Sequence, residues 1–484
     1  MHFIVKVFPE IIIKSPPVRK RFIRQLRDNL RHLLGGVDER IRVQRDWEKI
    51  EVSLPGAGST ITAQVSDVLA HTPGIATFSL VHEYPLGDDL DALVPPVISH
   101  WGPALEGRTF VVRAKRAGQH SFTSHDVERS LGGALLHQTG ARGVDLRYPE
   151  VTVRVEIKDE RLLIVAQQRK GLGGYPLGTQ EPVLSLVSGG FDSTVASYLM
   201  MKRGLRTHFC FFNLGGRAHE MAVKEISYYL WDKYGASHSV KFVTVPFEDV
   251  VGEILAKVDN AYMGVVLKRM MLRAAGRVAE HFQFHALVTG ESIAQVSSQT
   301  LPNLNVIDQV TDHLVLRPLI VMDKGDIIDI SRAIGTETFS AAVPEYCGVI
   351  SVRPTTRARP DQIVSAEEGF DMGVLERALE KLQVRAIQDV VMDLEGASDA
   401  PAIVTEVGDD LVVDIRHPDE QELKPLALPP ERVLTIPFYR LSAQFPSLDA
   451  ERRYLLYCAK GVMSQLHAAH LKEAGHHNVA VYRP

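Results

Sequence analysis

The hexapeptide Ser-Gly-Gly-Phe-Asp-Ser at residues 188–193 constrains the fold of this 484-residue chain more than any other stretch. The apolar run 183–187 before it has the pattern of a buried parallel strand, and the apolar-periodic segment 194–203 after it has that of a helix. A glycine-rich turn between a strand and a helix directs free backbone N–H groups and the positive end of the helix dipole to one point. That point suits a phosphate or pyrophosphate group.

The individual residues of the turn fit anion binding. Gly189 and Gly190 let the backbone approach an anion closely, Ser188 and Ser193 add hydroxyl donors, and Asp192 could orient a metal-bound or waiting nucleophile. The competing interpretation is an ordinary loop in which Asp192 or Ser193 caps the helix. The complete hexapeptide in this setting resembles the PP-loop of ATP pyrophosphatases, which adenylate a substrate and release pyrophosphate. No G-x-x-x-x-G-K-[ST] sequence occurs, which argues against γ-phosphoryl transfer.

Composition indicates a multidomain globular protein. The length corresponds to about three or four domains, 45% of the residues are hydrophobic, and no apolar stretch reaches the ~20 residues that a membrane helix needs. The first residues do not have the pattern of a signal peptide. Three cysteines, Cys210, Cys347 and Cys458, are too few and too dispersed for a disulfide scaffold or a zinc site. We therefore expect a cytoplasmic protein with no membrane association and no zinc site.

Basic charge is distributed unevenly along the chain. The net charge of −5 does not by itself indicate nucleic-acid binding, but residues 1–50 carry 12 Lys and Arg against 6 Asp and Glu, and residues 51–100 carry no Lys or Arg. Such clusters fit either a solvated helix face or a surface that contacts RNA phosphates. The candidate RNA-binding residues are Lys20, Arg24, Arg113, Lys115 and Arg116.

Residues 1–75 have the element order of a ferredoxin-like domain. The pattern predicts strands at 2–8, 40–44, 49–54 and 75–83, with helices at 15–35 and 60–71. Read in sequence, these elements have the order βαββαβ, which is that of the ferredoxin-like fold.

Residues 76–168 resemble a THUMP domain, a module found in RNA-modifying enzymes. The predicted elements are helices near 88–100 and at 124–140, and strands at 109–115, 151–157 and 161–167. The resemblance lies in the order of these elements, not in a sharp motif. The glycine-rich stretch 170–176 is a linker by composition.

Residues 177–392 alternate strand and helix, as in a doubly wound α/β domain. An amphipathic segment at 365–387 is expected to be helical, and 393–401 reads as a second linker. Residues 402–484 are predicted to form a last α/β domain. The predicted strands of the larger domain are 183–187, 207–212, 241–245, 285–289 and 314–316.

A second anion-binding turn follows a predicted strand at 454–457. Cys458 ends that strand, and the loop after it opens into a predicted helix at 465–475. A cysteine in such a turn lies among backbone N–H groups at a helix N-terminus, which stabilises a thiolate or persulfide anion. Lys460 adds positive charge. The alternative is a half-buried structural cysteine.

Two elements of the last domain together resemble a rhodanese. The first is the sequence Asp414-Ile415-Arg416 at the end of a predicted strand, and the second is C-x-x-G-x-x-S from Cys458 to Ser464. Rhodaneses carry sulfur as a cysteine persulfide, and Cys458 occupies that position. Cys210 lies in a predicted buried strand and is expected to belong to the core.

The chain as a whole resembles the 4-thiouridine synthetase family of tRNA sulfurtransferases (the ThiI family), in its longer form with a rhodanese domain. The resemblance rests on the PP-loop, on Glu-Tyr-Cys-Gly at 345–348 and on the loop of Cys458. It implies a multidomain α/β protein: ferredoxin-like domain, THUMP domain, PP-loop ATP pyrophosphatase domain and rhodanese domain. Further matching stretches are 211–216, 267–271, 289–291, 295–300 and 317–319.

The resemblance implies a set of nucleotide contacts. Phe211 and Phe212 would lie near an adenine edge, Lys268 could neutralise phosphate charge, and Gly290 would permit close backbone approach. Lys268 could instead be a solvated helix lysine. The full expected set is Leu186, Val187, Ser188, Gly189, Gly190, Ser193, Phe211, Phe212, Lys268, Gly290 and Gln299.

The resemblance also implies catalytic roles for four residues. Asp192 and Lys324 match positions that the family needs for activity, although Lys324 could be a surface residue beside Asp323. Cys458 would receive sulfur from a cysteine desulfurase, and Cys347 would resolve the persulfide to form a Cys347–Cys458 disulfide that a thiol reductant opens. A thiol at Cys347 could also be incidental.

The implied reaction is thiolation of tRNA. ATP, with Mg²⁺ shielding its phosphates, would adenylate O4 of the uridine at position eight, and sulfur would replace it to give 4-thiouridine. A sulfur-carrier protein of thiazole synthesis is a further implied partner, and a homodimer is left open. Two other functions remain: a PP-loop enzyme that amidates or otherwise adenylates a metabolite, and a noncatalytic RNA-binding sulfur-relay adaptor. An RNA methyltransferase is disfavoured because no G-x-G-x-x-G loop follows a strand.

Overall fold

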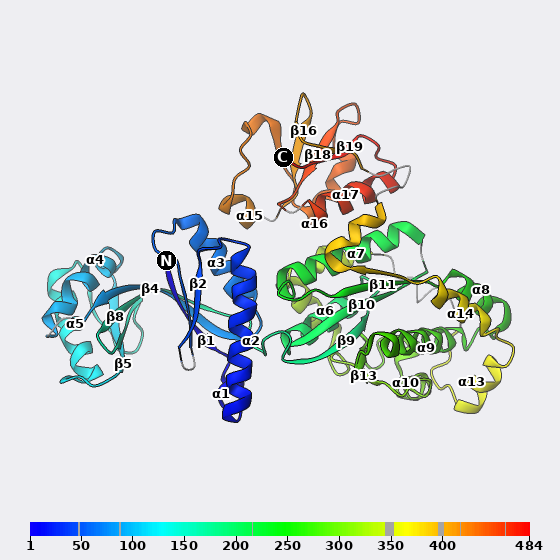
Figure 1. The fold of residues 1–484 in the computed structure, drawn as a ribbon, viewed down its shortest axis with the longest axis horizontal. Coiled ribbons are helices and arrows are strands. Elements are labelled where there is room, and N and C mark those ends of the chain that lie inside the picture. The colour runs from blue at the N-terminus through cyan, green and yellow to red at the C-terminus, as the bar shows by residue number, and fades with distance from the viewer. Residues whose placement is uncertain are drawn as a thin grey trace. The chain divides into compact units, whose positions relative to one another are not determined.

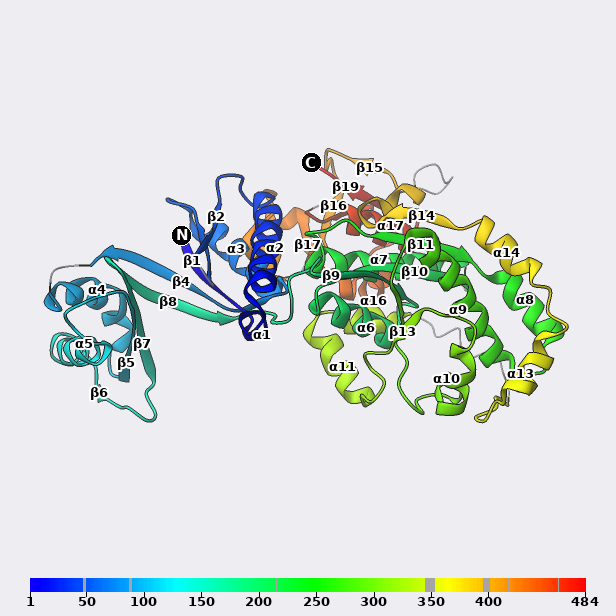
Figure 2. The same cartoon turned by 60° about the horizontal axis from the view of Figure 1, so that its bottom comes forward.

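The computed structural model describes residues 1–46, 49–86, 89–214, 216–343, 353–394, 401–416, 418–459 and 461–484. The chain forms two compact units, residues 1–176 and 177–484. Figures 1 and 2 show their helices and strands. In the part of the chain that is described, no helix combines the length and the apolar character that crossing a membrane requires.

The first half of unit 1 has the predicted ferredoxin-like topology. Its strands lie in the order β2-β3-β1-β4 and all pair antiparallel. Helix α2 turns Phe22, Leu26 and Leu30 into the core and leaves Lys20 and Arg24 exposed. The elements are β1 (His2–Val7), α1 (Pro9–Ile12), α2 (Pro16–Gly35), β2 (Arg42–Asp46), β3 (Lys49–Ser53), α3 (Ser59–His71) and β4 (Ile75–Pro85).

The second half of unit 1 continues the same sheet. Strand β4 pairs with β1 on one side and with β8 on the other, where Thr77–Pro85 lies against Lys170–Arg161. One eight-stranded sheet, β2-β3-β1-β4-β8-β7-β5-β6, therefore spans the unit. The further elements are η1 (Asp91–Leu93), α4 (Val94–Leu105), β5 (Thr109–Ala117), α5 (Ser124–Gln138), β6 (Gly143–Val144), β7 (Val151–Lys158) and β8 (Arg161–Lys170).

Unit 2 contains a six-stranded sheet of the doubly wound type. The order is β13-β12-β9-β10-β11-β14, and the five strands from β13 to β11 are parallel. The chain leaves β9 toward β10 and later returns to the other side of β9 with β12. The carboxyl end of β9 is thus a topological switch point, where this fold class binds ligands. The strands are β9 (Gln180–Leu186), β10 (Leu205–Asn213), β11 (Lys241–Pro246), β12 (Ala286–Val288), β13 (Leu314–Leu316) and β14 (Gln383–Ala386).

Helices cover the six-stranded sheet, and helix α9 lies against its main hydrophobic core. Cys210 is fully buried in β10, as expected, and burial raises the pKa of its thiol. The helices are α6 (Phe191–Lys202), α7 (Gly216–Tyr234), α8 (Glu248–Lys257), α9 (Met263–Phe282), η2 (Ser297–Gln299), α10 (Leu301–Asp308), α11 (Lys324–Ala333) and α12 (Glu337–Ala342).

The segment 365–387 is not one helix, so that expectation was wrong in part. It contains the end of α13 (Pro360–Glu367), then α14 (Gly373–Glu380), then strand β14, and η3 (Ile387–Leu394) begins at its last residue. β14 pairs antiparallel with the edge strand β11. A strand that is added at a sheet edge depends on a distant partner, which local periodicity does not reveal.

The end of the chain forms the predicted last α/β domain. Its five strands are parallel in the order β15-β19-β18-β16-β17, so β18 is central. The elements are β15 (Ile403–Val404), β16 (Leu411–Asp414), α15 (Pro418–Leu423), η4 (Pro430–Arg432), β17 (Val433–Thr435), α16 (Phe438–Gln444), η5 (Phe445–Ser447), β18 (Tyr454–Tyr457), α17 (Val462–Glu473) and β19 (Val479–Tyr482).

Candidate functional site

The turn 188–190 joins the central strand β9 to helix α6. Gly189 has φ +81°, a conformation that other residues rarely adopt. The Ser188 N–H donates to Ser193 Oγ over 3.2 Å, and Ser193 Oγ donates to the Gly190 carbonyl over 3.3 Å. Gly190 is the N-cap of α6 and no side chain caps the helix. The interpretation of Asp192 or Ser193 as an ordinary cap is therefore wrong, and the first N–H groups of α6 face the switch point.

A cavity of about 300 Å³ lies at this switch point. One of the expected nucleotide residues, Gly189, is absent from its lining. The expected residues that line it are Leu186, Val187, Ser188, Gly190, Ser193, Phe211, Phe212, Lys268, Gly290 and Gln299, and Asp192 lines it too. Leu214, Leu267, Met271 and Ile307 supply further apolar surface. The cavity thus has a polar loop at one side and an apolar wall suited to a flat ring.

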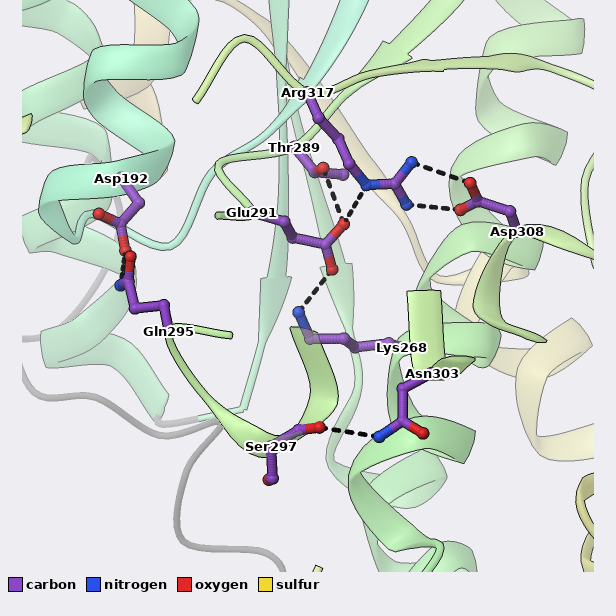
Figure 3. A network of polar contacts seen from close by, with 9 residues as sticks. All are labelled: Asp192, Lys268, Thr289, Glu291, Gln295, Ser297, Asn303, Asp308 and Arg317. Atoms are coloured by element: carbon purple, nitrogen blue, oxygen red, sulfur yellow. Dashed lines mark hydrogen bonds and ion pairs between the residues drawn. The ribbon is translucent and has the colours of Figure 1, made fainter. Parts of the chain in front are cut away.

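Asp192 is held from two directions. Gln295 Nε2 donates to its Oδ2 over 2.7 Å (Figure 3), and Lys324 Nζ donates to its Oδ1 over 2.8 Å. Lys324 is the first residue of α11, and its ammonium also lies 5.5 Å from the Phe191 ring centroid. The structure therefore brings Asp192 and Lys324 together at the first turn of α6.

The loop after β12 packs directly on the PP-loop helix. A Cβ atom on Gly290 would lie 2.5 Å from the backbone carbonyl carbon of Asp192 and 2.5 Å from the nitrogen of Ser193. Only glycine permits that approach. Ala294 has φ +63°, an uncommon conformation for a residue with a side chain, and it directly precedes Gln295. This loop positions Gln295 against Asp192.

Lys268 lies in a network of four charged residues (Figure 3). Its Nζ is 2.6 Å from Glu291 Oε1, and Arg317 Nε is 2.8 Å from Glu291 Oε2. Arg317 in turn donates both terminal nitrogens to Asp308. Burial alone would raise the pKa of Glu291, but the charges of Lys268 and Arg317 lower it to about 2. Glu291 is therefore ionised at any working pH.

The polar residues around the cavity that the sequence did not predict as site residues include Glu291, Gln295 and His219. His219, on α7, lies 3.0 Å from the Ser188 carbonyl oxygen through Nε2, and burial lowers the pKa of its imidazole. Neutral His219 therefore supports the loop by donating to Ser188. Glu291 and Gln295 lie in the stretches 289–291 and 295–300. The family resemblance of these stretches was the sequence signal that could have identified both residues.

Cys458 follows the central strand β18 and lies in the loop that leads into α17, as predicted. The Ser464 N–H donates to Cys458 Sγ over 3.3 Å, and Ser464 Oγ is 3.4 Å from the same sulfur. Gly461 has φ +76°, which shapes the loop. Cys458 is buried, 9% exposed. The expected contributions of Lys460 and Cys347, including a Cys347–Cys458 disulfide, lie outside the described residues.

Two further features surround the Cys458 loop. The Arg416 guanidinium donates to both carboxylate oxygens of Asp414, and both residues are buried. Helix α17 packs on α7, and there Glu225 Oε1 lies 3.4 Å from His467 Nδ1 and 3.9 Å from His470 Nδ1. The Asp-x-Arg pair is thus a local ion pair beside β18, whereas Glu225 connects α7 with α17.

The candidate RNA-binding residues are all exposed and form two groups. Lys20 and Arg24 lie on α2, which packs on β2 at one end of the eight-stranded sheet. Arg113, Lys115 and Arg116 lie on β5, next to the other end. The structure does not bring the two groups into one cluster.

Three family models match the chain. The ThiI ferredoxin-like domain matches residues 2–79, the THUMP domain matches residues 88–166, and the thiamine biosynthesis protein (ThiI) model matches residues 178–372. The last of these ranges contains the turn 188–190, Lys268, Glu291 and Lys324.

Curated relatives and a solved structure match as well. Over 484 residues, with complete coverage of both chains, this chain is 56% identical to a tRNA sulfurtransferase of Pseudomonas aeruginosa and 57% identical to a tRNA sulfurtransferase of Azotobacter vinelandii. A crystal structure of a 4-thiouridine synthetase–RNA complex with bound ATP is similar with a TM-score of 0.70 and 28% identity. That match covers 80% of this chain and 99% of the other.

Proposed function

The chain belongs to the ThiI family of tRNA sulfurtransferases, and from that premise we propose that it uses ATP to convert a tRNA uridine, at position eight, to 4-thiouridine. The observation that carries the proposal is the cavity at the carboxyl end of β9, which has the PP-loop on one side and an apolar wall on the other. An adenine ring fits against Phe211, Phe212 and Leu267, with the phosphates toward Ser188 and Gly190. The ATP and RNA bound in the similar 4-thiouridine synthetase support the use of both by this chain.

The first step is adenylation of uridine O4. Oxygen at C4 is a poor leaving group, and transfer of AMP to it makes it a good one while pyrophosphate leaves. The backbone N–H groups at the start of α6 would stabilise the departing pyrophosphate. Lys268 and Lys324 would supply positive charge at the phosphates.

A magnesium ion fits this step. Mg²⁺ takes one or two carboxylates, phosphate oxygens and water, and Asp192 presents a carboxylate at the loop. The Glu291 carboxylate is already committed to Lys268 and Arg317. In the described part of the chain, Asp192 has one cationic partner, Lys324, where Glu291 has two, and its side chain is more exposed (22% against 8%), so Asp192 would hold the ion, which would shield phosphate charge when bound.

The second step is sulfur transfer, for which the last domain would act as a rhodanese. Cys458 would take a sulfur atom from a cysteine desulfurase as a persulfide. In one route the outer sulfur of the persulfide attacks C4 and expels AMP, and the Cys347 thiolate then attacks Cys458 Sγ, which forms the Cys347–Cys458 disulfide and leaves the outer sulfur on C4. In the other route Cys347 attacks Cys458 Sγ first and releases hydrosulfide, which then attacks C4 and expels AMP. A thiol reductant returns both cysteines to thiols.

The tRNA would bind unit 1 through phosphate contacts and shape. The exposed basic residues on α2 and β5 supply the contacts. Transfer of sulfur to a sulfur-carrier protein for thiamine thiazole, and assembly as a homodimer, are further proposals that rest on the family alone.

Reconstitution tests the proposed function. Full-length protein, ATP, Mg²⁺, cysteine, a cysteine desulfurase and unmodified tRNA should yield 4-thiouridine by nucleoside mass spectrometry. The Cys458→Ser variant should release pyrophosphate with tRNA but form no 4-thiouridine, and Cys210→Ser serves as the matched cysteine control. Tight tRNA binding without any ATP-dependent thiolation would favour an adaptor and refute the proposal, and amidation of a small metabolite would refute it as well.

A further inference from the structure

Glu291 is a buried carboxylate in the wall of a cavity that is proposed to hold an anion. It is 6% exposed and lies three residues after the end of β12. A negative side chain in such a place opposes phosphate binding unless it has another role. Glu291 therefore requires an explanation that the proposed reaction does not supply.

The contacts of Glu291 divide between its two oxygens. Oε1 accepts from Lys268 Nζ at 2.6 Å, while Oε2 accepts from Arg317 Nε at 2.8 Å and from Thr289 Oγ1 at 3.0 Å. Figure 3 shows the Lys268 side chain reaching the carboxylate from α9, with Arg317 on the opposite side of it. Three donors from three segments thus fix one carboxylate.

Arg317 is fixed by more than Glu291. Its two terminal nitrogens donate to Asp308 at the end of α10, in the forked geometry that guanidinium and carboxylate groups favour. Among the described residues Lys268 has no such second partner, and its ammonium group lies at the end of a flexible four-carbon chain. Arg317 and Asp308 therefore form the rigid part of the network. The position of the Lys268 ammonium group depends on Glu291.

The charges of the network cancel. Lys268 and Arg317 are positive, Glu291 and Asp308 are negative, so these four residues add no net charge to the cavity. Lys268 without the Glu291 carboxylate would attract phosphates more strongly, so attraction of phosphates alone does not explain the carboxylate. The arrangement instead gives a defined position to the Lys268 ammonium group, on a side chain that lines the cavity and is 22% exposed.

We propose that Glu291 is a positioning residue for ATP binding: it holds the Lys268 ammonium where the phosphates of the nucleotide meet the cavity wall. This rests on the proposed ATP site. When ATP binds, Lys268 donates a second hydrogen bond to a phosphate oxygen while it keeps its hydrogen bond to Glu291, because an ammonium group has three N–H donors. Arg317 and Asp308 keep Glu291 in place.

Two substitutions separate position from charge. Glu291→Asp keeps the charge but withdraws the carboxylate by one methylene group. Glu291→Gln keeps the size, but its NH₂ group must face Lys268 or Arg317, donor against donor. If Glu291 positions Lys268, both variants raise KM for ATP about tenfold or more, a loss of about 1.4 kcal/mol, with a smaller change in kcat.

Glu367 offers a matched control. It is also a buried carboxylate that accepts from two basic residues, Arg269 at 2.7 Å and Arg273 at 2.7 Å, and Arg269 and Arg273 lie on α9 like Lys268. Glu367 does not line the cavity. The Glu367→Gln variant should lose thermal stability as much as Glu291→Gln does, while its KM for ATP stays at the wild-type value.

ATP titration calorimetry and pyrophosphate release with tRNA provide the readouts. In a double-mutant cycle, Lys268→Met should raise KM for ATP much less in the Glu291→Gln background than in the wild type. Tighter ATP binding by Glu291→Gln would show that the carboxylate only opposes phosphate and would overturn the inference. Wild-type ATP affinity in both Glu291 variants would overturn it too, whereas failure of the wild-type protein to bind ATP would refute the proposed function instead.

Discussion

Lys324 Nζ lies 2.8 Å from Asp192 Oδ1 at the first turn of α6. The two residues are 132 positions apart and come from the starts of two different helices, α6 and α11. Gln295 holds the other carboxylate oxygen of Asp192. The two residues that were expected to be essential therefore act as one ion pair beside the proposed pyrophosphate site.

Removal of either partner should impair pyrophosphate release. Asp192→Asn and Lys324→Met should each lower the rate with tRNA about 10²-fold, since misplaced groups at a reacting centre cost that much. The double variant should be little worse than either single one, because the pair acts as a unit. Thermal stability should change by no more than about 1 kcal/mol, as both side chains are partly exposed. Lys257→Met, an exposed lysine on α8, is the control and should keep full activity.

Gly290→Ala should disturb the PP-loop helix. The added methyl group would meet the Asp192–Ser193 peptide at 2.5 Å, so we expect a loss of about 1–3 kcal/mol in unfolding free energy and weaker ATP binding. Gly252→Ala, within α8, meets no atom within 4 Å and should stabilise the protein by about 0.5–1 kcal/mol. Calorimetric unfolding and ATP titration measure both effects, and equal ATP affinity in the two variants would contradict the assignment of Gly290.

Basic residues of unit 1 should contribute to tRNA affinity through phosphate contacts. Lys20→Ala and Lys115→Ala should each weaken binding and reduce the slope of log affinity against log salt by about 1. Filter binding across a salt series measures that slope. Lys257→Ala, in unit 2, is the control. An unchanged slope in the first two variants would remove α2 and β5 from the RNA surface.

The contact between α7 and α17 should depend on pH through His470. The Glu225 carboxylate, whose Oε1 lies 3.9 Å from His470 Nδ1, raises the pKa of His470, so the stability that this charge pair contributes is complete below the ordinary value of about 6.5 and is lost as pH rises through the raised value. His467 works in the opposite sense, because burial lowers the pKa of its imidazole. Burial would raise the pKa of Glu225, but the two histidines lower it below its ordinary value. The Glu225 carboxylate therefore loses its charge, and its pairing with the histidines, only in acid.

We therefore expect the stability difference between wild type and His470→Gln to shrink as pH rises from about 5.5 to 8.5. Urea unfolding midpoints of the two proteins at several pH values measure it. The difference between wild type and His467→Gln should move in the reverse direction. A difference for His470→Gln that grows with pH would contradict the pairing with Glu225.

Local patterns predicted most of the fold. The order βαββαβ, the strand–turn–helix units at 188 and 458, and the buried strand of Cys210 all depend on short-range periodicity and on glycine, which the sequence displays directly. The prediction of a helix over 365–387 was wrong in part because residues near its end form strand β14, which exists only through pairing with β11. Periodicity identifies an amphipathic segment but not the partner that converts part of it to a strand.

The candidate site was predictable only for residues with local signatures. The turn 188–190 could be predicted from the hexapeptide 188–193 alone. The role of Glu291, in contrast, depends on Lys268 and Arg317, which are 23 and 26 positions away. Gln295 reaches Asp192 across 103 positions. Such pairings follow from the order of strands at the switch point, and charges in a linear sequence do not disclose them.

The continuous sheet of unit 1 fixes the spacing between the two groups of basic residues. Backbone hydrogen bonds between β4 and β8 join the half that carries α2 to the half that carries β5, with no linker to bend. An RNA that contacts both basic groups must therefore bring its phosphates to a preset spacing. If both groups contact one RNA, as proposed, a duplex lengthened or shortened by a few base pairs would lose one set of contacts.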